Sequence, residues 1–386
     1  MEEWKEYRLG EVCSRLRSGK SIKADSVFSI GKYPVIGGNG VRGYADESNF
    51  EGQAAVIGRQ GAYCGNVRFF DGEAYMTEHA VVIVGNEHAD TRFLACLLSL
   101  MHLGNLSAQS AQPGISVQTL SKQLVRLPSI SYQKKVSAII KSLDDKIEVN
   151  RRINDNLEQQ AQAMFKSWFI DFEPFAGGEF VESELGLIPK DWKVVSLSAI
   201  ADYINGLAMQ KYRPQDNESG LPVLKIKELG QGRTDESSEL CSPSLIGSKY
   251  IIDDGDIIFS WSGTLMVKVW CGGKCGLNQH LFVVEPKDYP GWFAYQWTKH
   301  HLDNFIHIAK DKAVTMGHIK RGELDKAKVV VPDKTNMATI DLMMKPLHNQ
   351  IISNMKESRR LASLRDTLLP RLMSGELKVN EIENAI

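Results

Sequence analysis

The stretch "LDDKIEVNRRINDNLEQQ", residues 143–160, places apolar residues at helical spacing but carries two asparagines, Asn150 and Asn154, within the apolar stripe. Extended in both directions, the stripe steps by alternating threes and fours, which is the heptad seam of a coiled-coil helix. The seam positions of this helix are Val136, Ile140, Leu143, Ile147, Asn150 and Leu157. A single helix would leave this seam exposed, so the pattern predicts a partner helix.

A second helix near the end of the chain repeats the seam at a constant offset, which maps Asn150 onto Asn354. Its seam positions are Ile340, Met344, Leu347, Ile351, Asn354 and Leu361. Two unrelated amphipathic helices would not keep this register over so many turns. Because the domain between them lets the chain turn round, we expect the helices to pack against each other as an antiparallel coiled coil. The asparagines would then set the register at some cost in stability.

The regions that precede the two helices also resemble each other. "EEWKEYRLGEVCSRLRSG" (2–19) is similar to "KDWKVVSLSAIADYING" (190–206), and "TEHAVVIV" (77–84) is similar to "NQHLFVVE" (278–285). Strand-like runs of this kind alternate with Gly-rich turns and with segments of helical spacing. Each repeat is therefore predicted to be a compact α+β domain.

The predicted order along the chain is domain, helix, domain, helix. The first globular domain covers residues 1–132, the central helix 133–175, a linker 176–190, the second globular domain 191–333 and the C-terminal helix 334–380. The predicted fold class is α+β, with two repeated domains separated by two long helices.

The composition excludes several classes of protein. The 386 residues are 43% hydrophobic, which is enough for two ordinary cores, but no apolar run reaches the roughly 18 residues that would span a membrane. Six scattered cysteines and a charged N-terminus without an apolar signal core favour reduced thiols and a cytoplasmic location. The net charge of −1 excludes a globally basic nucleic-acid binder but not a local basic groove.

Three stretches carry a resemblance to a known family, the specificity (S) subunits of type I restriction–modification systems. "AMFKSWFIDFEPF" (163–175) resembles the end of that family's central spacer helix. "LGLIPKDWKVVSL" (185–197) resembles the entry to its second target-recognition domain, and "LRDTLLPRLMSGEL" (364–377) resembles the close of its C-terminal helix. Together with the repeated domains, the resemblance covers essentially the whole chain.

The resemblance implies a DNA sequence-specificity subunit without catalytic activity of its own. Each target-recognition domain would read one half of a bipartite, asymmetric site in double-stranded DNA. The helices would set the half-site spacing and dock two modification (methyltransferase) subunits, and restriction subunits with translocase and nuclease activity would complete the enzyme. This subunit would bind no cofactor, because S-adenosylmethionine, ATP and Mg²⁺ would belong to the partner subunits, and no membrane partner is implied.

Base recognition requires side chains with paired donors or acceptors on protruding loops. In the first domain, "GGNGVRGY" (37–44) and "GRQGAYCGN" (58–66) offer such side chains between glycines that let the backbone approach DNA closely. The candidate DNA-binding residues are Asn39, Arg42, Arg59, Gln60, Tyr63 and Asn66. The alternative is an ordinary Gly-rich hairpin with solvated polar side chains.

In the second domain, "SWSGTLMVK" (260–268) occupies the place equivalent to "GRQG". Its candidate DNA-binding residues are Ser260, Trp261, Ser262, Thr264 and Lys268, although Trp261 could equally be a core residue. Lys225 and Lys227 could contact phosphate. Basic and acidic residues balance in both domains, so we expect most phosphate contacts to come from partner subunits.

Four aromatic residues near the end of the central helix are more than one seam can bury: Phe165, Trp168, Phe169 and Phe172. Exposed aromatic clusters commonly anchor interfaces, so these residues are candidates for methyltransferase binding. The alternative is that all four belong to the intramolecular core.

The sequence gives little support for a catalytic, metal-binding or nucleotide-binding site. His79 and His280 occupy equivalent positions without a nucleophile or metal cluster nearby, so we expect them to be structural. Cys271, Cys275 and His280 are zinc-ligand types, but a fourth ligand is missing, so no metal site is predicted. Amino-methyltransferase motifs and a GxxxxGK(S/T) loop for ATP are absent. The alternatives to a specificity subunit are a stand-alone nuclease and a protein-binding scaffold.

Overall fold

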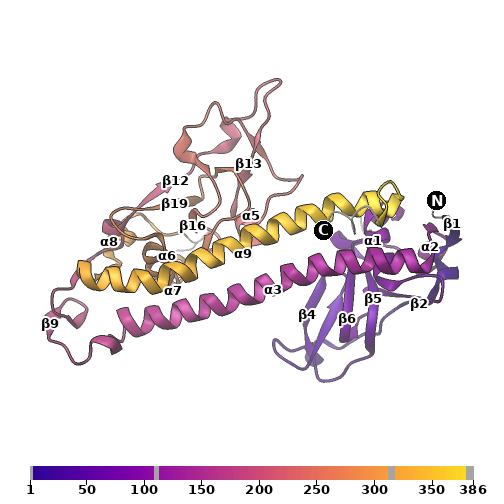
Figure 1. The fold of residues 1–386 in the computed structure, drawn as a ribbon, viewed down its shortest axis with the longest axis horizontal. Coiled ribbons are helices and arrows are strands. Elements are labelled where there is room, and N and C mark those ends of the chain that lie inside the picture. Colours follow the sequence, from indigo (N-terminus) through magenta and orange to yellow (C-terminus); the bar gives the residue numbers. More distant parts are fainter. Residues whose placement is uncertain (1–2, 108–112, 312–317, 380–386) are drawn as a thin grey trace. The chain divides into compact units, whose positions relative to one another are not determined.

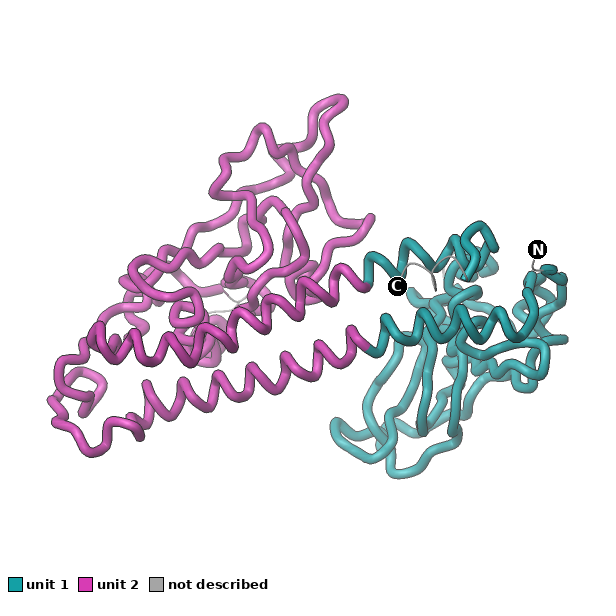
Figure 2. The backbone as a smooth tube through the Cα atoms, viewed as in Figure 1, with its two compact units in different colours: residues 1–145, 362–386 teal, residues 146–361 magenta. Residues whose placement is uncertain are grey.

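The computed structural model describes residues 3–107, 113–311 and 318–379. The chain divides into two compact units, residues 1–145 with 362–386 (unit 1) and residues 146–361 (unit 2) (Figure 2). Each unit holds one globular domain and a segment of both long helices, α3 (Ile130–Phe169) and α9 (Lys334–Ser374) (Figure 1). Unit 1 is therefore formed by two stretches that are far apart in the sequence.

The globular part of unit 1 is built on a six-stranded sheet with the strand order β2-β7-β5-β6-β3-β4. Neighbouring strands are antiparallel except β3 and β6, which run parallel. A separate antiparallel pair joins β1 to β8. The strand bounds are β1 Lys5–Arg8, β2 Cys13–Ser18, β3 Tyr33–Gly37, β4 Gly40–Ala45, β5 Phe50–Gly58, β6 Val67–Met76, β7 Ala80–Gly85 and β8 Leu124–Leu127.

Helix α1 (Thr91–Leu100) covers this sheet. It begins at Asp90, whose carboxylate accepts a hydrogen bond from the Phe93 amide at 2.9 Å and so satisfies one of the free N–H groups of the first turn. Phe93 and Leu98 are buried in one core with residues of β5, β7, α3 and α9. The shorter helices of this unit are η1 Leu9–Val12, η2 Ala24–Ser26, η3 Gly61–Tyr63, η4 Leu103–Leu106 and α2 Val117–Ser121.

The globular part of unit 2 uses two four-stranded sheets, with the orders β12-β19-β16-β17 and β14-β13-β18-β15. Its strands are β11 Lys193–Ser196, β12 Ala201–Asn205, β13 Leu221–Leu224, β14 Leu240–Cys241, β15 Ile251–Ile252, β16 Ile257–Ser260, β17 Met266–Val269, β18 Cys275–Leu277, β19 Leu281–Pro286 and β20 Lys328–Val331. Its helices are α4 Leu197–Ile200, α5 Ile226–Gln231, η6 Met209–Lys211, η7 Ser248–Tyr250, α6 Gly291–His300, α7 Leu302–Asp311 and α8 Gly322–Lys326. The stretch between α3 and β11 contains η5 (Glu173–Phe175) and a hairpin of β9 (Phe180–Ser183) and β10 (Gly186–Pro189).

The two globular parts share one backbone framework. The pair β1–β8 corresponds to β11–β20, and the parallel pair β3–β6 corresponds to β13–β18. At equivalent places, Gly19 N donates to Ala80 O at 3.0 Å and Gly206 N donates to Leu281 O at 3.0 Å. A Cβ at Gly206 would lie only 2.3 Å from two backbone oxygens, which explains why the position is glycine in both repeats. The structure thus contains the two repeated α+β domains predicted from the sequence.

The long helices differ in extent from the prediction. Helix α3 spans Ile130–Phe169 instead of 133–175, and Phe172 lies beyond it in a left-handed conformation with φ of 54°. Helix α9 runs through Pro346 without a break and ends before Gly375, whose φ is +76°. The predicted end at 380 lies outside the described residues. No helix in the described part of the chain is long and apolar enough to cross a membrane.

Within unit 2, polar seam residues of the two helices bond to each other. Asn354 Nδ2 donates to Asn154 Oδ1 at 2.8 Å, and Asn154 Nδ2 donates to the Ile351 carbonyl oxygen at 3.1 Å. Asn150 Nδ2 donates to Glu357 Oε2 at 2.7 Å and to Ser358 Oγ at 3.3 Å. The partners thus run in opposite directions along α3 and α9 (Figure 1). Asn150 and Asn354, which the repeat relates to each other, do not pair directly.

The seam residues near the start of each helix also belong to the hydrophobic cores of the globular domains. Val136 and Ile140 are buried in the core of unit 1, and Ile340 and Met344 are buried in the core of unit 2. The central seam positions are only half-buried: Leu143, Ile147, Leu157, Leu347, Ile351 and Leu361. Each helix is therefore anchored by its first turns to one globular domain.

Candidate nucleic-acid interface

In unit 1 the two stretches predicted to read DNA lie next to each other. A Cβ placed on Gly38 would lie 3.2 Å from both Gly58 Cα and His79 O, so the two backbones approach closely here and a side chain would be crowded. Around it, Arg42, Gln60, Tyr63 and Asn66 are exposed, and Arg59 is half-buried. Asn39 is exposed, and its Oδ1 accepts a hydrogen bond from Arg68 Nη2 at 3.1 Å.

The loop that carries Arg59 and Gln60 is held by backbone hydrogen bonds on both sides. Arg59 N donates to His79 O at 2.9 Å, and Ile115 N donates to Arg59 O at 3.0 Å. Gly61 N donates to Pro113 O at 3.0 Å. The backbone of this loop is therefore well fixed, which a base-contacting side chain needs because hydrogen bonds to bases tolerate little displacement.

Sequence reasoning missed Arg68. It lies on β6, just outside the two predicted stretches, yet its exposed guanidinium reaches the turn between β3 and β4. The alternation of polar Asn66 and Arg68 with apolar Val67 and Phe69 was the available signal, because successive strand residues face opposite sides. Arg68 adds a guanidinium group to the candidate DNA-binding surface of unit 1.

In unit 2 the structure contradicts two of the predicted contacts. Ser260 is 0% exposed and its Oγ donates to the Ser262 carbonyl oxygen, while Ser262 is 5% exposed and its Oγ lies 2.9 Å from His280 Nδ1. Both hydroxyl groups are thus used inside the domain and cannot reach a base. The prediction failed because the final residue of β16 and the tip that follows it turn inward.

The other predicted residues of this stretch have mixed surroundings. Thr264 is exposed. Trp261 is half-buried against the core, and its Nε1 donates to Asn205 Oδ1 at 2.9 Å. Lys268 donates to the Gly230 carbonyl oxygen at 2.8 Å, and burial lowers the pKa of its ammonium group. Thr264 therefore remains the most accessible of the five candidates.

The two lysines predicted to meet phosphate already have partners. Lys225 Nζ lies 2.7 Å from Glu239 Oε1. Lys227 Nζ donates to Ser237 Oγ at 2.9 Å and lies 3.8 Å from Asp235 Oδ2. A lysine that is already neutralised gains less from a phosphate, because contact with DNA must first displace the carboxylate.

The cysteines of the possible zinc site are separated in the fold. Cys271 is buried in the main core of unit 2, whereas Cys275 is buried in a second cluster with Leu224 and Trp270. Burial raises the pKa of the Cys271 thiol to about 11 and that of Cys275 to about 12, so both are protonated at neutral pH. Across the described ranges, no group of three or more His, Cys, Asp or Glu side chains is placed to hold a metal ion.

A comparison with protein families now places the chain. The model of the type I restriction modification DNA specificity domain matches residues 1–159 and 189–361. The chain belongs to this family. The MjaIX specificity subunit of a type I restriction enzyme from Methanocaldococcus jannaschii is 28% identical, over 73% of this chain and 67% of that protein. The HindI specificity subunit from Haemophilus influenzae is 22% identical, over 98% of this chain and 100% of that protein.

A solved structure of a related protein has the same fold as this chain. The crystal structure of the type I restriction-modification system S subunit from M. genitalium aligns with 96% of this chain and 96% of its own, with a TM-score of 0.57 and 15% sequence identity. The likeness extends over both repeats and both long helices.

The aromatic residues near the end of α3 were expected to form an exposed cluster, and the structure places them differently. Phe165 and Phe169 are buried in the core of unit 2, and Phe169 is only 1% exposed. Trp168 and Phe172 are half-buried against the same core. For Phe165 and Phe169 the structure thus favours the alternative, burial in the intramolecular core, because α6 supplies Trp292, Phe293 and Trp297 as partners that the helix seam alone could not.

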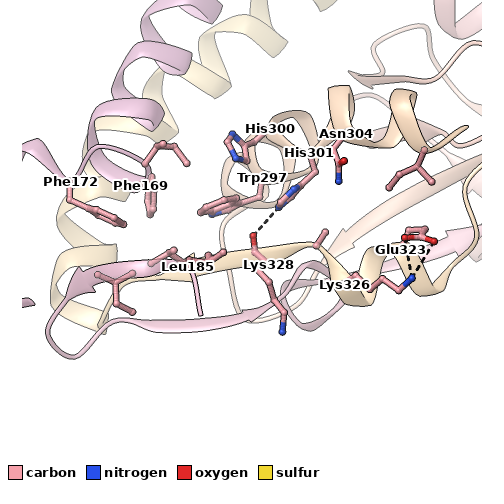
Figure 3. A pocket seen from close by; sticks show the side chains of 15 residues that line it. Phe169, Phe172, Leu185, Trp297, His300, His301, Asn304, Glu323, Lys326 and Lys328 are labelled. Atoms are coloured by element: carbon pink, nitrogen blue, oxygen red, sulfur yellow. Dashed lines mark hydrogen bonds and ion pairs between the residues drawn. The ribbon is translucent and has the colours of Figure 1, made fainter. Parts of the chain in front are cut away.

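A cavity of about 410 Å³ lies beside these aromatics (Figure 3). Phe169, Leu185 and Trp297 line its apolar side, and His300, His301 and Glu323 contribute polar groups. His301 Nε2 lies 2.9 Å from the Lys328 carbonyl oxygen, and burial lowers the pKa of His301 to about 4. His301 is therefore neutral at pH 7 and can donate to that carbonyl, which ties the junction between α6 and α7 to β20.

We predict that Phe169→Ala destabilises unit 2 by about 3–5 kcal/mol, because it removes a fully buried ring from an aromatic cluster and enlarges an existing cavity. Denaturant unfolding followed by tryptophan fluorescence measures the loss. Phe28→Ala is the control, since Phe28 is 44% exposed in unit 1. Equal and small effects of the two substitutions would show that Phe169 is not a core residue.

Proposed function

We propose that this chain is the DNA sequence-specificity subunit of a type I restriction–modification enzyme, in which each globular domain is a target-recognition domain for one half of a bipartite, asymmetric site in double-stranded DNA. The observation that carries the proposal is that one backbone framework occurs twice with different side chains at its tip. Arg59 in unit 1 corresponds to Trp261 in unit 2, since Ile115 N bonds to Arg59 O as Ile319 N bonds to Trp261 O. Two copies of one backbone framework with different side chains would suit two half-sites of different base sequence.

The long helices would set the distance between the half-sites. Helix α3 has 40 residues and α9 has 41, and a helix of this length measures about 60 Å. The proposed arrangement is an antiparallel coiled coil, and the Asn154–Asn354 hydrogen bond supports it. A buried polar pair in a seam specifies register, because any other register would leave the amides unpaired.

The modification subunits would dock on the helices as well, but the described surface favours different residues from those predicted. Val149 and Ile153 are 45% and 41% exposed and lie one turn apart on α3. They line a shallow depression together with Arg152, Asn156 and Leu157. An apolar strip on an otherwise polar helix face fits an apolar strip of a partner helix.

The chain would act in the cytoplasm and would be non-catalytic by itself. Two modification subunits would supply methylation of adenine with S-adenosylmethionine, and restriction subunits would supply the reactions that need ATP and Mg²⁺. Because basic and acidic residues balance in both domains, these partners would also supply most contacts to phosphate.

Deleting the gene for this chain should erase methylation at one bipartite adenine motif in its host, and restoring the gene should restore that motif. Single-molecule sequencing of the two genomes measures the difference. If every methylated motif persists in the deletion strain, the chain does not specify DNA methylation.

Lengthening the helices by one heptad should widen the gap between half-sites by about three base pairs, because seven residues add about 10 Å of helix and DNA rises about 3.4 Å per base pair. Duplicating residues 148–154 and residues 354–360 together keeps the polar seam pairs opposite each other. Binding to duplexes with a graded series of gaps gives the preferred spacing. A variant that binds as tightly as the native complex with an unchanged gap would show that the helices do not set the spacing.

Ile153→Asp should weaken co-purification of the modification subunit at least about tenfold while leaving the unfolding midpoint unchanged, because a charge replaces an exposed apolar contact. Leu187→Asp is the matched control, since Leu187 is 60% exposed on the hairpin of β9 and β10. Equal assembly of both variants would place the docking surface elsewhere.

A further inference from the structure

The turn between β6 and β7 occupies the centre of the candidate DNA-binding surface of unit 1. Thr77 N donates to Ile36 O at 2.9 Å, beside the first predicted stretch, and His79 O accepts from Arg59 N at 2.9 Å, within the second. Ala80 N donates to Thr77 O at 3.0 Å and closes the turn. Glu78 and His79 therefore sit at a rigid tip between the two stretches, although sequence analysis assigned neither a contact with DNA.

The turn between β18 and β19 in unit 2 is built in the same way. Asn278 N donates to Leu224 O at 3.2 Å, His280 O accepts from Trp261 N at 3.4 Å, and Leu281 N donates to Asn278 O at 3.0 Å. These three bonds match those of unit 1 one by one. Gln279 therefore occupies the position of Glu78, and His280 occupies the position of His79.

The two tips also share a contact between side chains. Glu78 Oε1 lies 3.3 Å from His79 Nε2, and Gln279 Nε2 lies 3.3 Å from His280 Nε2. In both tips the histidine thus lies against the preceding side chain and limits its freedom. One position on one framework carries a carboxylate in the first domain and an amide in the second.

The free hydrogen-bonding groups of the two side chains differ. The Glu78 side chain is 39% exposed, but its Oε2 is buried and has no partner, so only Oε1, which also faces His79 Nε2, can accept a further bond from outside. Gln279 can give one Nε2–H to His280 and retains a second N–H together with Oε1. Glu78 thus offers an acceptor alone, whereas Gln279 offers an acceptor beside a donor.

We infer that Glu78 and Gln279 are specificity-determining residues at equivalent positions of the two half-sites, Glu78 accepting from the N4 amino group of a cytosine and Gln279 pairing with N6 and N7 of an adenine. Adenine presents an acceptor, N7, beside its amino group, so it repels a carboxylate and complements an amide. Cytosine presents its amino group in the major groove without that acceptor, so it complements a carboxylate. This inference rests on the proposed function and names two of the residues that carry it.

The test is a reciprocal exchange in the full chain, co-expressed with its modification subunit. In Glu78→Gln, one position of one half-site should change from cytosine to adenine, with the spacing and the other half-site unchanged. In Gln279→Glu, one position of the other half-site should change from adenine to cytosine. Glu6→Gln is the control, because Glu6 is exposed on β1, in a different sheet, and should leave the motif unchanged.

Methylome sequencing gives the motif of each variant, and binding of the purified complex to duplexes with each of the four bases at the mapped position gives the preference. Each exchange should shift the base preference by roughly tenfold to hundredfold. An unchanged motif in both variants overturns the inference and leaves the proposed function standing. If a variant no longer methylates, the duplexes decide: a selective gain for the new base supports the inference, and an equal loss for all four bases overturns it.

A native complex that methylates no bipartite motif would instead contradict the proposed function. The two failures are therefore distinguishable. The inference fails when the native complex has a motif that the variants leave unchanged, whereas the proposed function fails when the native complex has no bipartite motif.

Discussion

The hydrogen bond from Asn354 to Asn154 joins the middle of α3 to α9 within unit 2, and the proposed helix pair depends on the register it marks. A buried amide without a partner costs about 1–3 kcal/mol, so a slipped register would be penalised at each asparagine. The same register brings Asn150 to Glu357 and Ser358. Asn150 Oδ1 nevertheless stays buried without a donor, which an apolar residue would avoid. In the proposed coiled coil these asparagines would therefore provide register at the expense of stability.

Each domain is fastened to the end of a long helix by an equivalent tryptophan. In unit 1, Trp4 lies against Gly375, where α9 ends, and a Cβ there would come within 2.9 Å of the Trp4 ring nitrogen. In unit 2, where α3 ends, Trp192 packs edge-to-face with Phe172 and Phe175 and is tilted against Phe169. The first domain is thus closed by the helix that follows the second domain along the chain. This contact between the first domain and the end of α9 explains why unit 1 combines residues 1–145 with residues from 362 onward.

The repeated framework separates what must stay constant from what can vary. Backbone hydrogen bonds fix the tips at residues 77–80 and 278–281, and Gly19 and Gly206 allow the strands beside them to approach closely. Side chains at the tips are not needed for those bonds, so they can differ between the domains without altering the fold. A protein that recognises an asymmetric site needs such freedom, because base identity is read by side chains while the backbone only positions them.

The periodic features were predictable from the sequence. The repeat, the alternation of domain and helix, and the seam positions all follow from spacing, because a helix or strand that buries one face must repeat its apolar residues with the period of its backbone. The stretches around Gly38 and Gly58, both selected from the sequence for their glycines between polar residues, lie next to each other in the structure, and their contact with DNA stays a prediction. Burial of the hydroxyl groups of Ser260 and Ser262 could not be deduced from local composition.

Only the tertiary structure decided which side chains face solvent at the ends of these elements. Phe169 is buried because α6, more than a hundred residues later, brings its aromatic residues to the same place. Glu78 and Gln279 gain their position from hydrogen bonds to strands that are distant in sequence. The spacing of apolar residues shows only which face of a single helix or strand is buried. Contacts between elements depend on how their faces meet, and that information is not local to any stretch of the sequence.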